Sequence, residues 1–231
     1  MSTIPRIAKR YVPCLAGLLL LLLTLGATPA SADTVSFDLN ISNGNILPPA
    51  ASYGTVTLTL NGDGSINVGV VGASGYGFFG YSGDMFGFNE SIAGDPNIYI
   101  LNASAGVTVA PNPNTVCSGG GCQLDGFGKF EFMVGGPTGS SPLGSFSFDV
   151  LPASGTFTTV YQLVELSTGG ASGVPNFAAH VSPINGCAAG VANCTGWAGD
   201  GGNPVPEPAS IALFGSGLVT LAGMIRRRRK Q

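Results

Sequence analysis

The chain has 231 residues, of which only 9% are charged, and its formal net charge is −3. Of its nine Lys and Arg residues, only Lys129 lies between Asp33 and Asn203, where it is set against eleven acids, so this span has a net charge near −10. Such a span repels phosphate backbones and anionic lipid surfaces, which excludes nucleic-acid binding and an electrostatic membrane anchor.

The first 32 residues have the three-part composition of an export signal. Basic residues within the first ten positions precede an apolar stretch, Leu15–Leu25, and small residues follow at Ala30 and Ala32. We expect a secretory signal peptide over residues 1–32, cut by signal peptidase between Ala32 and Asp33. The alternative is an uncleaved amino-terminal anchor.

From residue 33 to about 203 the apolar residues alternate with polar ones, which is the period of a β-strand. The turn sequence Asn61-Gly62-Asp63-Gly64 between two alternating runs predicts a β-hairpin. We expect about ten short strands, of which the last is at 177–181. They cover residues 34–41, 55–60, 66–70, 76–88, 97–101, 106–110, 129–134, 145–150, 159–166 and 177–181.

These strands predict an all-β exported domain over residues 33–203, an antiparallel β-sandwich flanked by the signal peptide and one carboxy-terminal transmembrane helix. A jelly-roll-like arrangement is favoured over an immunoglobulin-like one, because the strands exceed seven and no Cys–Trp–Cys core pattern occurs. No fixed repeat period indicates a solenoid.

Four cysteines lie in the predicted domain: Cys117, Cys122, Cys187 and Cys194. They allow three pairings, of which Cys117 with Cys122 and Cys187 with Cys194 is favoured, because each pair encloses a Gly- or Ala-rich loop. A zinc site made by all four thiolates is disfavoured, since neither pair has the C-x2-C spacing and export favours disulfides. We therefore expect no metal centre.

Residues for catalysis are sparse. His180 is the single histidine and lies in an apolar, strand-like stretch, where a packing role is the commoner one. Glu131, Asp149 and Glu165 lie on separate predicted strands and could face one another as the carboxylates of a glycosidase, but acids spread along a chain supply such sets by chance. We predict no catalytic site, no enzymatic activity and no cofactor.

Two weaker binding hypotheses remain. Trp197, the single tryptophan, and Tyr81 could stack on sugar rings if exposed, although a core position for Trp197 is the more common arrangement. Calcium could bridge the loop carboxylates of Asp84, Glu90 and Asp95.

The carboxy-terminal residues 204–231 have three parts in strict order. The triplet Pro206, Glu207 and Pro208 precedes an uncharged run from Ala209 to Ile225, about 26 Å long as a helix, which we expect to span the membrane transiently. Five basic residues then stop transfer: Arg226, Arg227, Arg228, Arg229 and Lys230. An ordinary tail anchor would need no such triplet.

This order resembles the PEP-CTERM sorting signal of Gram-negative bacteria, whose processing enzyme is the membrane protein exosortase. Residues 125–130 and 177–197 are also similar, more weakly, to segments of PEP-CTERM proteins. The resemblance implies export, exosortase as a partner, removal of the tail near the triplet, and a cell-surface or extracellular-matrix destination among exopolysaccharide. It favours a structural or adhesive protein, with a carbohydrate-binding module or, less favoured, a polysaccharide-acting hydrolase as alternatives.

Overall fold

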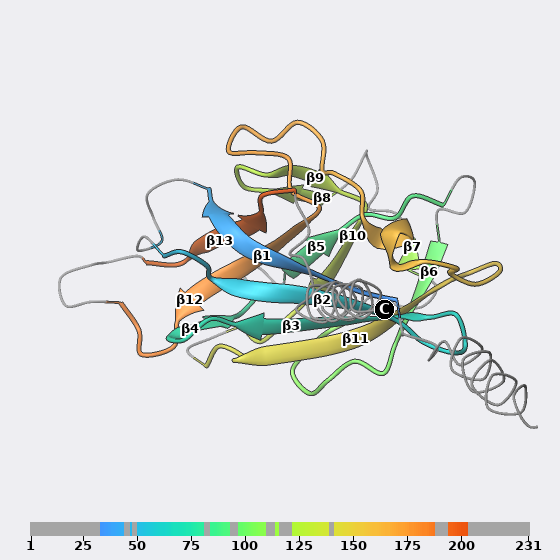
Figure 1. The fold of residues 1–231 in the computed structure, drawn as a ribbon. Helices are drawn as coiled ribbons and strands as arrows, with labels where there is room; N and C mark the ends of the chain where they lie inside the picture. Colours follow the sequence, from blue (N-terminus) through green and yellow to red (C-terminus); the bar gives the residue numbers. More distant parts are fainter. Residues whose placement is uncertain are drawn as a thin grey trace, which may run out of the picture. The chain divides into compact units, whose positions relative to one another are not determined.

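A computed structural model of the chain describes residues 33–43, 47, 50–80, 84–92, 97–109, 114–115, 122–138, 141–187 and 194–202. The compact unit that holds all of them begins at Asp33. Its strands and its one short helix are shown in Figure 1. In chain order they are β1 (Thr34–Ser42), β2 (Gly54–Leu60), β3 (Ile66–Gly72), β4 (Tyr76–Phe78), β5 (Asp84–Phe88), β6 (Asn97–Leu101), β7 (Asn114–Thr115), β8 (Cys122–Leu124), β9 (Gly128–Phe130), β10 (Phe132–Gly135), β11 (Ser145–Pro152), η1 (Val160–Leu163), β12 (Phe177–Pro183) and β13 (Gly196–Asp200).

Eleven strands form one curled antiparallel sheet in the order β10-β5-β12-β13-β1-β2-β3-β11-β6-β7, with β4 paired to β12 beside this path. β8 and β9 form a separate hairpin. The predicted all-β, antiparallel class is confirmed. Hydrogen bonds join these strands in one continuous path, so strand pairing alone does not divide them into the two sheets of a sandwich. The jelly-roll-like sandwich therefore stays a prediction.

The run β1–β2–β3 follows from the alternation in the sequence. Phe37 lies opposite Val56, and Leu58 lies opposite Val68, so one face of these strands is wholly apolar and buried. Ser and Thr residues point to the other face. The hairpin predicted around Asn61 is confirmed, and its turn is stabilised by the Asp63 carboxylate, which accepts hydrogen bonds from the Ser65 amide and hydroxyl at 3.0 and 2.7 Å.

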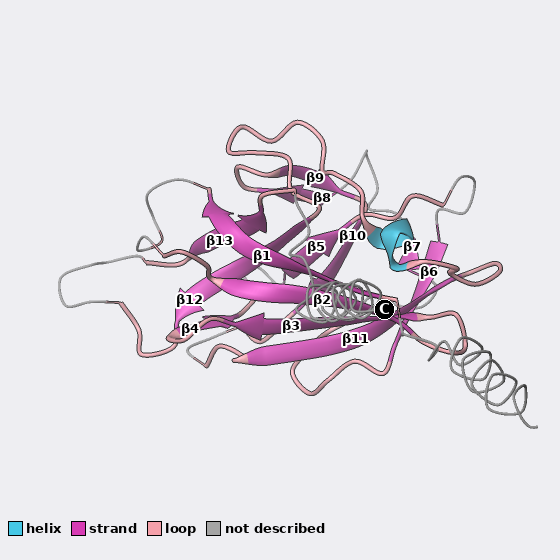
Figure 2. Ribbon diagram, in the orientation of Figure 1, coloured by secondary structure: helices cyan, strands magenta, loops and turns pink. Residues whose placement is uncertain are grey.

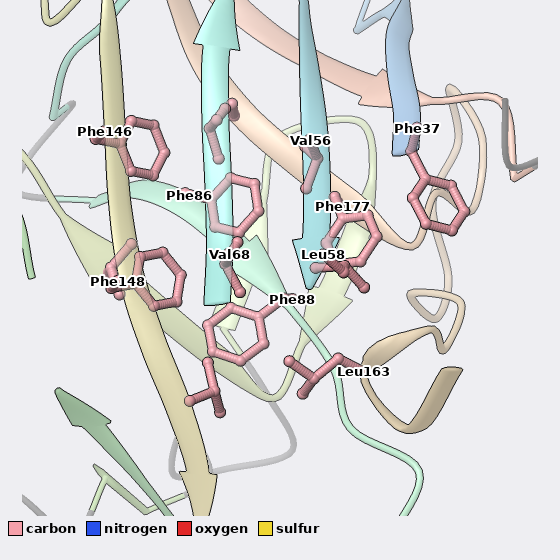
Figure 3. Packing of buried hydrophobic residues seen from close by; sticks show 14 of the residues in the cluster. Phe37, Val56, Leu58, Val68, Phe86, Phe88, Phe146, Phe148, Leu163 and Phe177 are labelled. Atoms are coloured by element: carbon pink, nitrogen blue, oxygen red, sulfur yellow. The ribbon is translucent and has the colours of Figure 1, made fainter. Parts of the chain in front are cut away.

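Aromatic side chains fill the inside of the curl, where β5 faces β11 (Figure 3). The ring of Phe86 lies 5.7 Å from Phe146 and 6.0 Å from Phe177, and the ring of Phe88 lies 5.7 Å from Phe148. Each of these side chains removes roughly 150–250 Å² of surface from water, so contacts between β5 and β11 carry much of the stability of the curl.

Isolated β-bridges join segments that are not neighbours in the strand order of the sheet. The backbone N–H of Thr108, after β6, donates to Gly135 O at 3.0 Å, and the N–H of Gly135 donates back at 2.8 Å. Phe78 and Leu143 make the same reciprocal pair at 2.8 and 2.7 Å. Within the described residues the strand predicted at 106–110 is reduced to the Thr108 bridge.

A second, smaller apolar cluster lies outside the curl. It forms where side chains of the β8–β9 hairpin pack against the outer face of β5, β12 and β13. Its buried members are Leu124, Phe127, Phe130, Ala178 and Trp197. The two segments that weakly resemble PEP-CTERM proteins, residues 125–130 and 177–197, both contribute to this cluster.

The strand predicted at residues 159–166 is wrong, because residues 160–163 form the 3₁₀ helix η1, drawn in cyan in Figure 2. Thr159 and Gln162 form a capping box, in which each side chain hydrogen-bonds the backbone of the other residue. Val160 and Leu163 are three residues apart, so both point into the core from one side of the helix. The prediction that 177–181 is the last strand is also wrong, since β13 follows.

In the described part of the chain no helix is both long and apolar enough to cross a membrane. The transmembrane helix predicted at 209–225 lies outside this part.

Candidate functional site

Trp197 and His180 lie side by side on the outer face of β13 and β12, where the two residues are directly paired. The Trp197 ring is 6% exposed and lies 5.1 Å from the His180 ring, whose other neighbour is Phe79 at 4.3 Å. A sugar-stacking platform needs an exposed aromatic face, so this burial fits the core position favoured for Trp197 and not the alternative stacking role. Tyr81, the second predicted stacking residue, lies outside the described residues.

His180 is held as a neutral imidazole. Burial lowers the pKa of His180 from 6.5 to about 4, although a hydrogen bond to the backbone of Phe79 opposes the change. Its packing between two aromatic rings fits the structural role expected of a lone histidine on a strand.

Two of the three carboxylates considered for glycosidase chemistry lie near one another. Asn89 links their backbones: its Oδ1 accepts from the Glu131 N–H at 2.7 Å, and its Nδ2 donates to Glu165 O at 3.2 Å. Burial, and then the negative charge of Glu131, raise the pKa of the Glu165 carboxyl.

Asp149, the third candidate, is not part of that pair. It lies on the outer face of β11, where its Oδ1 accepts from Asn67 Nδ2 at 2.7 Å and its Oδ2 accepts from Asn102 Nδ2 at 2.7 Å. Its two oxygens are thus occupied by amides from neighbouring elements. The three acids do not meet in one place, and the proposed set of Glu131, Asp149 and Glu165 is corrected to Glu131 and Glu165.

The described residues contain no group of three or more His, Cys, Asp or Glu side chains placed to hold a metal ion. Of the acids considered for calcium, burial raises the pKa of Asp84, and Glu90 is buried with its Oε2 accepting from the Ile92 N–H at 2.8 Å. Asp95 lies outside the described residues.

A disulfide joins Cys187 and Cys194, which confirms one of the two predicted local pairs. Cys122 is also disulfide-bonded, while its predicted partner Cys117 lies outside the described residues. Since Cys187 and Cys194 are bonded to each other, the alternative zinc site made by four thiolates is excluded.

Acidic side chains fix both ends of the described domain, and sequence reasoning missed both. Asp33, the residue after the predicted signal cleavage point, accepts hydrogen bonds through Oδ2 from Thr159 Oγ1 at 2.8 Å and Val160 N at 3.1 Å. Asp200, at the end of β13, is fully buried and accepts from Asn176 Nδ2 at 2.8 Å and Phe177 N at 2.7 Å. Desolvation raises the pKa of Asp200, and these hydrogen bonds oppose the change.

The predicted sorting residues lie outside the described residues. They are Ala32 on the amino-terminal side, the triplet Pro206, Glu207 and Pro208, and the basic residues Arg226, Arg227, Arg228, Arg229 and Lys230. The described fold ends at Gly202, four residues before the triplet begins.

Comparison with known proteins assigns the carboxy-terminal segment. Residues 204–230 match the family model of the PEP-CTERM protein-sorting motif. The chain therefore carries a PEP-CTERM motif, which identifies exosortase as its processing partner and marks an exported protein with a cell-surface or extracellular destination. No curated protein and no solved structure matches the chain.

Proposed function

We propose that the chain is an exported structural or adhesive protein of the cell surface or extracellular matrix, without enzymatic activity. Signal peptidase frees its amino terminus at Asp33, and exosortase removes the tail after a transient membrane-anchored stage. The single observation that carries this proposal is the PEP-CTERM match at residues 204–230, which begins just after the last described residue of the folded domain.

The surface of the domain supports an adhesive role among neutral, hydrated polymers. Paired hydroxyls run along β1 and β2: Ser36 Oγ and Thr57 Oγ1 lie 3.0 Å apart, and Thr34 Oγ1 donates to Thr59 Oγ1 at 3.4 Å. Gly69 follows Thr57 across to β3, and a Cβ added there would meet no atom closer than 3.8 Å. Packing does not require this glycine, and its lack of a side chain leaves the backbone of β3 open to the approach of a polymer chain.

The experiment that tests the proposal is the intact mass of the protein recovered from the cell surface and the medium. We expect a species that begins at Asp33 and ends near Glu207, because both terminal segments are processing signals. A recovered species that still contains residues 226–230 would show an ordinary tail anchor and would overturn exosortase processing.

A carbohydrate-binding module is the second candidate, and the hydroxyl pairs on β1 and β2 favour it. Retention of the domain on immobilised neutral polysaccharide should fall when Gly69→Gln covers this stretch of backbone with a side chain. The matched control Val71→Gln changes an exposed residue two positions further along β3 and should leave retention unchanged. Equal retention of both variants and the unchanged domain would remove this surface from consideration.

A further inference from the structure

The two points at which the chain leaves the described domain lie toward the same end of neighbouring strands. Asp33 precedes β1 and Gly202 follows β13, and these strands are antiparallel partners. In such a pair the start of one strand lies at the end of the other. Leu39 is opposite Asp200, so Asp33 lies only about 20 Å further along β1, at roughly 3.4 Å per residue.

The segment that contains η1 connects these two exits. At its first end, Thr159 and Val160 donate hydrogen bonds to the Asp33 carboxylate. At its other end, Leu166 Cδ2 lies 3.8 Å from the position that a Cβ on Gly202 would take. Residues 159–166 therefore run from the start of β1 to the point where the chain leaves β13.

This segment presents two apolar side chains to solvent. Val160 and Leu163 are fully buried, which fixes the helix against the core, whereas Tyr161 is 53% exposed and Leu166 is 48% exposed. We name Tyr161 and Leu166 the exit surface. A tyrosine, with an apolar ring and a polar tip, is a residue that typically lies at the boundary between lipid and water.

The length of the chain beyond Gly202 limits how far this surface can be from a membrane. Six residues separate Gly202 from Ala209, where the uncharged run begins. The distance between Gly202 and Ala209 is therefore at most about 25 Å in any conformation, at roughly 3.6 Å per residue step. A short tether of this kind gives an effective concentration on the order of millimolar, so a weak contact is enough to be populated.

We propose that the exit surface rests on the lipid headgroup region of the membrane for as long as the tail anchors the chain. This inference rests on the proposed function, because it needs the transient anchor. The contact would orient the domain with both exits toward the membrane. Since Gly202 and Pro206 are four residues apart, the triplet begins within about 14 Å of the folded domain.

The charge near the exit surface selects the kind of lipid. Glu165 lies between Tyr161 and Leu166 in the chain, and the charge of Glu131 acts on it. The described residues contain a single Lys or Arg, Lys129, which belongs to the β8–β9 hairpin. The surface therefore fits zwitterionic headgroups and is repelled by anionic ones. Removal of the tail ends the tethering and releases the contact.

The test uses the tail-bearing chain, purified from cells that lack exosortase and inserted into phosphatidylcholine vesicles that contain headgroup spin-labelled lipid. A fluorophore is attached through Thr158→Cys, beside the exit surface, or through Ile184→Cys, which is also exposed and lies beyond the opposite end of β13. We expect several-fold stronger quenching at position 158 than at 184, and weaker quenching at 158 when phosphatidylglycerol is added.

Two variants then assign the contact to its residues. In the Thr158→Cys chain, Tyr161→Ser with Leu166→Ser should reduce quenching to the level at position 184, whereas Val71→Ser, a change at another exposed apolar residue, should leave it unchanged. Equal quenching at 158 and 184, or quenching that the double variant does not change, overturns the inference.

Vesicle flotation separates this inference from the proposed function. If the chain does not float with the vesicles, the transient anchor itself fails and the inference fails with it. If it floats without quenching at 158, only the membrane contact is wrong. A photo-crosslinker at position 161 that captures exosortase in cells, without lipid quenching in vesicles, would assign the exit surface to the enzyme and overturn the lipid assignment.

Discussion

Gly128 shows how a single residue fixes the second apolar cluster. Its φ is +84°, and a Cβ there would lie 2.1 Å from Thr168 O, a backbone atom that cannot move aside cheaply. Lys129 N–H donates to the same carbonyl at 2.8 Å. The tight approach of the β8–β9 hairpin to residues 167–173 therefore depends on the absence of a side chain at position 128.

Gly128→Ala should cost more than 3 kcal/mol of unfolding free energy, on the order of a severe core defect, because strain and a backbone clash add together. Gly155→Ala is the matched control: its φ is +83°, yet a Cβ would meet no atom within 4 Å. It should cost only about 1 kcal/mol, from backbone conformation alone. Urea unfolding measures both, and equal costs would show that the contact with Thr168 is unimportant.

His180 should make the domain less stable in mild acid. Its folded pKa, about 4, lies below its unfolded value of 6.5, so the unfolded state binds more protons between these values. This contribution to stability is complete above pH 6.5, is lost as the pH falls to 4, and amounts to about 3 kcal/mol. Asp200, with a raised pKa, acts in the opposite direction just above its ordinary value of 3.8.

The measurement compares unfolding free energies from pH 7 to pH 4 for the unchanged domain and for His180→Gln. Asp200 is present in both chains, so its effect cancels in the difference. We expect a smaller loss of stability in the variant. Parallel pH profiles would show that His180 does not bind its proton on unfolding in this range.

Residue roles were only partly predictable from the sequence. The favoured local disulfide at Cys187 and Cys194 followed from its short, Ala-rich loop. The separation of Asp149 from Glu131 and Glu165 did not, because strand order decides which acids share a face and alternation does not reveal it. Asp200 was missed because a buried carboxylate before a Gly-Gly pair has the composition of a surface loop.

At the scale of elements, regular two-residue alternation was the reliable signal. The strands predicted at 55–60 and 66–70 differ from β2 and β3 by one or two residues at their ends. η1 was mistaken for a strand although Thr159 and Gln162 have capping-box spacing, the signal that identifies a helix start. β13 was missed because Gly196–Asp200 is buried on both faces and so shows no alternation.

The loop between Cys187 and Cys194 connects β12 to β13, and its disulfide should stabilise this pair of strands. Closing so short a loop restricts the unfolded chain by about 2 kcal/mol. The double variant Cys187→Ala with Cys194→Ala should lower the unfolding free energy by that amount, as measured by urea denaturation. A change smaller than about 0.5 kcal/mol, the range of ordinary surface substitutions, would contradict a stabilising role.

At the scale of the whole molecule, the domain should be complete at Gly202. Its amide donates to Asp200 Oδ2 at 3.0 Å, the last described hydrogen bond before the sorting motif. A chain of residues 33–202 should unfold cooperatively with the same Tm as the mature protein. A chain ending at Gly199 leaves the Asn176 and Phe177 donors of Asp200 without an acceptor, at about 1–3 kcal/mol each. Calorimetry distinguishes the two, and equal Tm values would show that Asp200 does not hold the end of the domain.

The first strand of the sheet pairs with its last, since Leu39 of β1 lies opposite Asp200 of β13. Pairing between residues so distant in sequence requires closure of a very long loop, which makes folding slow. The edge of β1 that pairs with β13 also stays unpaired until residues 196–200 have been synthesised. The strand order thus delays completion of the sheet until the residues that lead into the sorting motif have been made, so the fold stays incomplete while the nascent chain is being produced.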